Sequence, residues 1–331
     1  MHLIFFLNVA FCNLLVINQL KNIMKFLKHI VVIALIMLAF TSCKSDKKTQ
    51  PEKDESVEVL TDNIIEVVAK DFTFTVDPII PSGWSTFKMK NIGMMEHFFL
   101  LTKLPDTIAF SDYIYGVGAA FGKSWNAYKN GEVDKGGAYG ILGENLPQWY
   151  ANAVAMGGIG IISGGQTGIT TMKLEPGNYV MECYIKTDNG QFHSELGMIN
   201  PITVSDKATQ MATPKANVEV VLTNENIEVK GDVLSGDNII AVHFKEHPEV
   251  GLGNDIHIIK VDENTNKDDV AFWMDWLNIG GLTSPGPAVF VGGVQEMPIG
   301  YTAYFNCNLE PGDYAFVGET PIGRYKAFTV K

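Results

Sequence analysis

The chain has 331 residues, 46% of them hydrophobic, and a formal net charge of −12. This apolar content is enough for two ordinary domains with their own cores, which argues against a disordered chain. The acidic balance argues against nucleic-acid binding and against direct attraction to anionic lipid.

The N-terminus has the pattern of a targeting segment. Residues 1–43 contain no acidic side chain, and from Met24, the expected true start, two lysines precede an eleven-residue apolar run that ends before Thr41-Ser42-Cys43. The run has the length of a signal-peptide core and is short for a membrane span. A plain membrane anchor is the alternative interpretation of these apolar stretches.

Small residues ahead of a cysteine resemble the lipobox of bacterial lipoproteins, which implies that Cys43 is a lipid attachment site. By the same resemblance, Lys44 after the cysteine permits transfer to an outer membrane, if the cell has one. Residues 44–56 are polar, charged and free of aromatics, so we expect a flexible tether. The sequence therefore predicts a protein of the cell envelope, periplasmic or surface-facing, that contacts the membrane through its lipid.

Two stretches of the chain repeat each other at an offset of 135 residues, namely 156–181 and 291–316. Gly157-Gly158 aligns with Gly292-Gly293, and the segment "LEPGNY" aligns with "LEPGDY". Such agreement in one register predicts a tandem duplication. We expect a first domain at 57–205, a small polar linker at 206–217 and a second domain at 218–331.

Each copy consists of short β-branched and aromatic runs separated by Gly, Pro and Asn, which is typical of strands. The predicted fold class is all-β, with two tandem Greek-key β-sandwiches. Residues 106–154 form an insertion in the first copy that is partly helical in period, and we expect it to cap the sandwich. The second copy has a shorter counterpart, whose Trp273 and Trp276 we expect to be packing residues.

The first copy offers one candidate for each ligand of a type 1 copper site, which uses two imidazoles, a thiolate and a weak axial thioether. His97 begins a strand after the segment "NIGMME", and Cys183 ends the strand that contains Tyr179. His193 and Met198 follow in the next loop.

These segments resemble the cupredoxins of the plastocyanin and halocyanin group over residues 57–205. The turn "N-x-G" before His97 and the strand "L-x-P-G-x-Y-x-x-x-C" ending at Cys183 match the family, as does the spacing of His193 and Met198. The resemblance implies a cupredoxin-like fold in which His97, Cys183 and His193 are equatorial ligands of one copper ion and Met198 is axial. It also implies electron transfer or copper handling with a redox or envelope partner, by a protein that is not itself an enzyme.

One departure from the family concerns the loop between the cysteine and the second histidine. Nine residues, 184–192, intervene here, whereas small blue copper proteins have two to four. The loop can return His193 to the same end of the sandwich if it forms a hairpin that turns at Asn189-Gly190.

The second copy lacks the ligand set. Gly318 stands where Cys183 does, and His257 persists without partners. We expect this copy to be metal-free and to act as a structural or docking element, with Cys307 as a core thiol. His243 and His247 are a weaker candidate for a separate metal pair.

Two alternatives to copper binding remain open from the residues alone. Cys183 could be a buried small hydrophobe and His97 a satisfied polar group, in a cupredoxin-like fold without metal. The protein would then be an interaction module for another envelope protein or a glycan. A fragment of a multicopper oxidase-like system would need further histidines.

Overall fold

The computed structural model describes residues 63–248 and 253–331, all of which belong to one compact unit. The predicted leader, Cys43 and the tether lie outside the described residues. Within the described part, no helix has both the length and the apolar character to cross a membrane.

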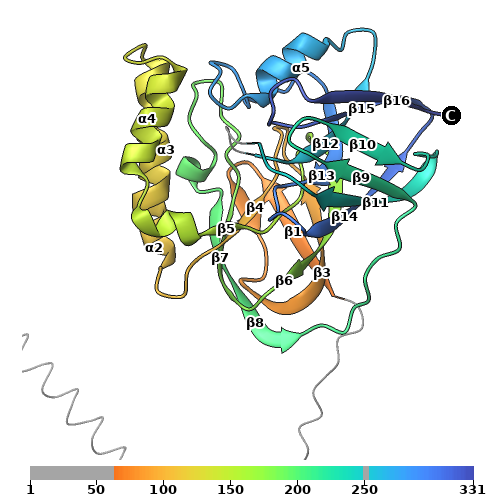
Figure 1. Ribbon diagram of the computed structural model, residues 1–331, viewed down its shortest axis with the longest axis horizontal. Helices are drawn as coiled ribbons and strands as arrows, with labels where there is room; N and C mark the ends of the chain where they lie inside the picture. Colours follow the sequence, from red (N-terminus) through yellow and green to blue (C-terminus); the bar gives the residue numbers. More distant parts are fainter. Residues whose placement is uncertain (1–62, 249–252) are drawn as a thin grey trace, which may run out of the picture. The chain divides into compact units, whose positions relative to one another are not determined.

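The first copy contains eight strands with a helical segment between them (Figure 1). Its strands are β1 (Ile64–Lys70), β2 (Thr73–Thr75), β3 (Ile79–Asn91), β4 (Leu100–Lys103), β5 (Val154–Ala155), β6 (Thr167–Leu174), β7 (Gly177–Glu182) and β8 (Ile199–Ala208). Alternation of buried and exposed side chains explains why these segments are strands: in β1, for example, Ile65, Val67 and Ala69 are buried and their neighbours face outward.

The second copy repeats this order of strands with a single short helix. Its elements are β9 (Val218–Leu222), β10 (Ile227–Lys230), β11 (Gly236–Phe244), β12 (Ile256–Val261), α5 (Lys267–Met274), β13 (Val289–Val294), β14 (Thr302–Leu309), β15 (Gly312–Val317) and β16 (Tyr325–Val330).

Strand β3 belongs to both layers of the first copy. Its first residues pair with β8, and from Gly83 onward it pairs with β6. Gly83 has a φ of +89°, a conformation that other residues rarely adopt, so the strand changes layers at this glycine. One layer contains β2, β1, β3 and β6, and the other continues from β3 through β8, β7, β4 and β5.

The two copies share a sheet. Strands β10, β9, β11 and β14 form one layer of the second copy, and β14 pairs antiparallel with β6 of the first. The other layer is a separate four-stranded sheet of β13, β12, β15 and β16. The predicted fold class, β-sandwiches with a helical insertion in the first, is confirmed. The sheets of the two copies are also continuous through β14 and β6, which the sequence did not indicate.

The repeated segments occupy equivalent strands. Both ends of β6 and β14 lie 135 residues apart, as do both ends of β7 and β15. In the "LEPGxY" turns, the hydroxyl of Tyr179 donates to the carbonyl of Glu175 at 2.8 Å, and that of Tyr314 donates to Glu310 at 3.1 Å. Each tyrosine thus closes its own turn, which gives a physical reason for its place in the repeat.

The insertion at 106–154 is helical, as predicted. It contains α2 (Phe110–Asp112), the π-helical segment η1 (Tyr113–Gly118), α3 (Ala119–Lys129), α4 (Lys135–Asn145) and the 3-10 segment η2 (Gln148–Asn152). Helices α3 and α4 pack against each other beside the strands of the first copy (Figure 1). In the second copy, Trp273 and Trp276 are 5% and 6% exposed, which agrees with their expected packing role.

Residues 206–217 were expected to form a linker, but the first of them belong to a strand. Residues 206–208 belong to β8, because Ala208 pairs with Ser82 of β3. The next residue continues this contact, since the backbone N–H of Thr209 donates to the carbonyl of Ser82 at 2.8 Å.

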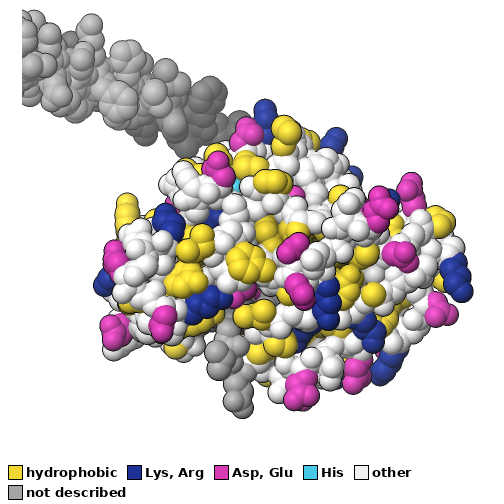
Figure 2. Space-filling model, turned by 90° about the horizontal axis from the view of Figure 1, so that it is seen from above, with side chains coloured by type: hydrophobic (Ala, Val, Ile, Leu, Met, Phe, Trp, Pro, Cys, Tyr) yellow, Lys and Arg dark blue, Asp and Glu magenta, His cyan; other side chains and the backbone are white. Residues whose placement is uncertain are grey.

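The glycine-rich run 157–165 lies at the junction between the copies. A side chain on Gly160 would lie 2.6 Å from the backbone of Gly293 and 2.7 Å from Nδ1 of His257. Gly160 therefore has no side chain because two backbones approach closely there. On the face in Figure 2, acidic and basic side chains are interspersed, so the net charge of −12 is not gathered into one acidic patch on that face.

Candidate metal centre

His97 is fixed by the turn that precedes it. The buried side-chain amide of Asn91 donates to the carbonyl of Met95 at 2.8 Å and accepts from the N–H of Gly93 at 3.0 Å. After this turn, the backbone N–H of His97 donates to the carbonyl of Ile162 at 3.0 Å. The turn that the sequence singled out therefore sets where the first imidazole enters the site.

Cys183 and Met198 are joined through their backbones. The N–H of Cys183, which directly follows β7, donates to the carbonyl of Met198 at 3.1 Å, and the N–H of Met198 donates to the carbonyl of His193 at 2.9 Å. Both the Cys183 and the Met198 side chains are fully buried. Gly197 has a φ of +115° and ends the 3-10 turn η3 (Ser194–Leu196), which brings the methionine back beside the cysteine strand.

The nine-residue loop forms the hairpin that the sequence left open as a possibility. Lys186 and Phe192 form a β-bridge, and Gly190 has a φ of +78° at the turn between them. The N–H of His193 then donates to the carbonyl of Ile185 at 2.8 Å. Through this hairpin, the longer loop returns the second histidine to the cysteine.

The structure brings His97, Cys183 and His193 together. Sγ of Cys183 lies 4.0 Å from Nδ1 of His97 and 3.8 Å from Nδ1 of His193, and one ligand atom from each side chain lies within 4.8 Å of the others. With the bond lengths known for zinc, about 2.3 Å to sulfur and about 2.0 Å to nitrogen, trigonal ligation separates the two donor atoms by about 3.7 Å. The three side chains therefore form a buried site with the dimensions of a type 1 copper centre.

Burial sets the protonation of these groups. It lowers the pKa of His97 to about 4, and burial followed by the neighbouring His97 lowers the pKa of His193 to about 3. Both imidazoles are therefore neutral at neutral pH and keep a lone pair for a metal. Burial also raises the pKa of the Cys183 thiol to about 12, so without a metal this group keeps its proton.

The second copy supports the loop from outside. The backbone N–H of Lys186 donates to the carbonyl of Leu282 at 2.6 Å, and its own carbonyl accepts from the N–H of Ser284 at 3.0 Å. Its Nζ donates to the carbonyl of Trp276 and lies 3.7 Å from the ring centre of Trp125. This fully buried lysine could not be recognised from the sequence, because the polar residues Thr187 and Asp188 follow it directly, as they would follow an exposed lysine in a loop.

The counterpart histidine of the second copy has hydrogen bonds on both ring nitrogens. Nδ1 of His257 accepts from the N–H of Ile161 at 3.0 Å, so Nε2 carries the proton and donates to Asp255 at 2.8 Å. By contrast, Nε2 of His97 and Nε2 of His193 have no hydrogen-bond partner.

The other residues that the sequence singled out have different outcomes. His243 contacts Thr302 at 2.9 Å and His247 lies 3.6 Å from Glu296, and neither histidine belongs to the cluster of three possible metal ligands found among the described residues. Cys307 is buried in the core, as expected. The axial role of Met198 stays a prediction, as does lipid attachment at Cys43.

Comparison with known proteins finds similar solved structures but no matching family. No family model and no curated protein matches the sequence. The solved structure of an auracyanin from Roseiflexus castenholzii is 19% identical over 44% of this chain and 98% of that one, with a TM-score of 0.26. A multicopper oxidase is 14% identical over 87% and 94% of the two chains, with a TM-score of 0.20. A copper-containing nitrite reductase from Thermus scotoductus is 9% identical over 81% and 61%, with a TM-score of 0.20.

These likenesses correct one prediction from the sequence. The statement that the protein is not an enzyme is wrong as it was made, because the matching solved structures include a multicopper oxidase and a nitrite reductase, which are enzymes. The resemblance in the sequence extends only to small electron carriers, so it gives no ground for excluding an enzyme.

Proposed function

We propose that the protein binds one type 1 copper ion through His97, Cys183 and His193, with Met198 as the axial ligand. It transfers single electrons or handles copper at the cell envelope, where a lipid on Cys43 holds it to the membrane. A redox or envelope protein is its partner, and the second copy, which arose by duplication, is structural.

The observation that carries this proposal is the convergence of one thiol and two imidazoles from distant parts of the chain in a fully buried position. Two nitrogens with one sulfur, and a thioether nearby in sequence, are the donor set that copper prefers among the common metals. When bound there, copper would supply a one-electron redox couple.

The residues of the chain hold the site in a fixed geometry. Asn91 fixes the strand of His97, the backbone bonds of Cys183 and Met198 join the two ends of the loop, and Lys186 fixes the loop to the second copy. With its donors held in this way, a bound copper ion would change its oxidation state with little movement of these side chains.

Copper loading tests the metal site. Purified protein with Cu(II) should show an intense visible charge-transfer band from thiolate to copper, and Cys183→Ser should abolish the band. Cys307→Ser is the matched control, because it removes the other buried thiol of the described part and should leave the band intact. If wild type gives no such band and binds copper no better than Cys183→Ser, the copper function is refuted.

Processing tests the anchor separately. Mass spectrometry of the membrane-extracted protein should find an acylated N-terminal Cys43, and Cys43→Ala should leave an unprocessed precursor. Cys307→Ser, which leaves the leader unchanged, is the control and should be processed normally. An unmodified N-terminus, or a leader retained in the wild type, would contradict the lipoprotein assignment.

A further inference from the structure

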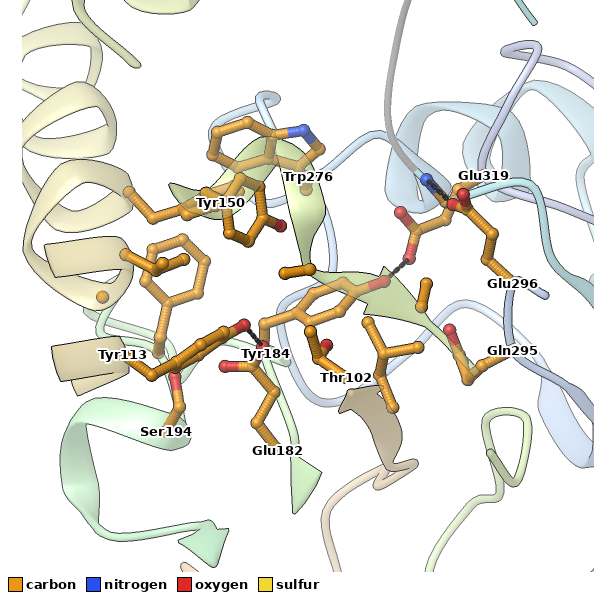
Figure 3. Close-up of a pocket in the computed structure, with 18 of the residues that line it drawn as sticks. Thr102, Tyr113, Tyr150, Glu182, Tyr184, Ser194, Trp276, Gln295, Glu296 and Glu319 are labelled. Atoms are coloured by element: carbon orange, nitrogen blue, oxygen red, sulfur yellow. Dashed lines mark hydrogen bonds between the residues drawn. The ribbon is translucent and has the colours of Figure 1, made fainter. Parts of the chain in front are cut away.

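A cavity of about 230 Å³ lies between the helical insertion and the two copies (Figure 3). Tyr113 and Tyr150 line it from the insertion, and Trp276, Gln295 and Glu319 line it from the second copy. Its volume is somewhat below the roughly 300–1,000 Å³ of pockets for drug-sized ligands, so it suits a smaller molecule.

The lining of the cavity contains acidic side chains and no basic one. Four glutamates line it and no lysine, arginine or histidine does; the glutamates are Glu182, Glu195, Glu296 and Glu319. Tyr113 donates a hydrogen bond to Glu182, and Tyr184 donates to Glu319 at 3.2 Å, as Figure 3 shows. A carboxylate offers about four lone-pair positions, so these groups keep the capacity to accept further hydrogen bonds.

Aromatic rings supply the rest of the lining. Six rings contribute, those of Tyr113, Phe121, Tyr150, Tyr184, Phe192 and Trp276. The faces of such rings are negative, and they attract cations most strongly where water is excluded.

Gln295 independently indicates a missing ligand. Its side chain is 1% exposed and lines the cavity, and neither its amide oxygen nor its amide nitrogen has a hydrogen-bond partner. A buried amide left without partners costs free energy, and nearly all buried polar groups in folded proteins are satisfied. A polar ligand in the cavity would satisfy this amide.

We propose that this cavity binds a small organic ammonium ion that carries an aromatic or other apolar group. Its N–H groups donate to the carboxylate of Glu319 and to the amide oxygen of Gln295, and its apolar part packs against Trp276 and the tyrosines. Burial, followed by the nearby Asp255, raises the pKa of Glu319 well above its ordinary value, which is the state of a carboxyl group that lacks a cation.

The cavity adjoins the metal-site residues. Glu182 and Tyr184 flank Cys183 in an extended stretch, and Phe192 and Ser194 flank His193; all four flanking residues line the cavity. Because successive side chains of an extended chain point to opposite sides, the cysteine faces the imidazoles while its neighbours face the cavity. A bound cation would therefore lie on the other side of the backbone from the candidate metal centre.

Isothermal titration calorimetry on metal-free protein tests the site. Phenethylammonium chloride should bind saturably at millimolar concentration or below, whereas phenethyl alcohol, which has the same apolar part without charge, should bind at least about tenfold more weakly. Glu319→Gln should weaken phenethylammonium binding by about tenfold or more, and Glu310→Gln, at an exposed turn, should leave it unchanged.

Trp276→Leu removes an aromatic ring from the lining and should weaken phenethylammonium binding about three- to tenfold. Gln295→Met removes the other polar group that accepts from the ligand, and it replaces Glu319→Gln as the test if that variant does not fold. Absence of saturable binding, equal affinity for the alcohol, or an unchanged affinity in both Glu319→Gln and Gln295→Met would overturn the proposal. Since the protein is metal-free in this assay, the outcome does not depend on whether the copper function holds.

Discussion

Replacing Lys186 by methionine tests the electrostatic cost of the loop that carries His193. Lys186 is fully buried, and burial lowers the pKa of its ammonium group from the ordinary 10.5 to about 7, although Asp275 and Glu319 act in the opposite direction. A lysine in this position is therefore costly to protonate in the folded protein. Methionine has a similar length and keeps the contact with apolar neighbours without a charge.

The sign of the pH dependence follows from proton binding. Between about pH 7 and pH 10.5 the unfolded chain holds the Lys186 proton more tightly than the folded protein, so the free energy of unfolding of the wild type rises with pH in this window. The lowered pKa of Lys186 reduces the free energy of unfolding by about 4 kcal/mol at pH 7 and by about 2 kcal/mol at pH 9. The wild type should thus gain about 2 kcal/mol over this interval relative to Lys186→Met.

Urea denaturation of the metal-free proteins at these two pH values measures the difference. Lys186→Met also removes the hydrogen bond from Nζ to the carbonyl of Trp276. The test therefore depends on how the difference in free energy of unfolding between the two proteins changes with pH, and not on its value at one pH. Lys326→Met, at an exposed position, is the control and should follow the wild type. If the difference between wild type and Lys186→Met is the same at both pH values, the reasoning is refuted.

Three further substitutions probe the frame of the site. Asn91→Ala removes buried hydrogen bonds from the turn before His97 and should lower the free energy of unfolding by about 3 kcal/mol in urea denaturation; a loss below about 1 kcal/mol would contradict the role of the turn. Trp125→Phe removes the 2.6 Å hydrogen bond from Nε1 to the carbonyl of Gly190 and should cost about 1 kcal/mol, with the same measurement. Met198→Leu should keep the visible band of the copper-loaded protein and raise its reduction potential in spectroelectrochemistry, because only a weak axial donor is lost; an unchanged reduction potential would contradict the axial role of Met198.

The features that could be predicted from the sequence are local ones. The turn "LEPGNY" combines a proline, a glycine and a tyrosine whose hydroxyl donates to the carbonyl of Glu175, so the hydrogen bond that closes the turn lies within one short segment. The three residues that converge in the structure could also be predicted, because a thiol and two imidazoles carry their chemistry with them, whereas the place of Met198 as a fourth ligand stays a prediction. The hairpin at Gly190 followed from the turn preference of Asn-Gly.

The features that were missed depend on contacts between distant segments. The backbone bonds of Lys186 to Leu282 and Ser284 join two copies that were expected to be separate domains. No period or turn residue in either segment encodes such a bond, since any exposed backbone group can make it. The pairing of β14 with β6 escaped prediction for the same reason.

The loss of ligands in the second copy becomes intelligible from these contacts. His257 stands where His97 does, but its Nδ1 accepts the N–H of Ile161 from the first copy, and Asp255 holds the opposite ring nitrogen. A residue type suited to metal binding thus serves the junction between the copies, at the point where Gly160 leaves no room for another side chain. The same second copy supplies the carbonyl groups that hold Lys186 and its loop. The candidate metal centre is therefore built by both copies, although all of its ligands come from the first, and a truncation before the second copy would leave the loop to His193 without its support.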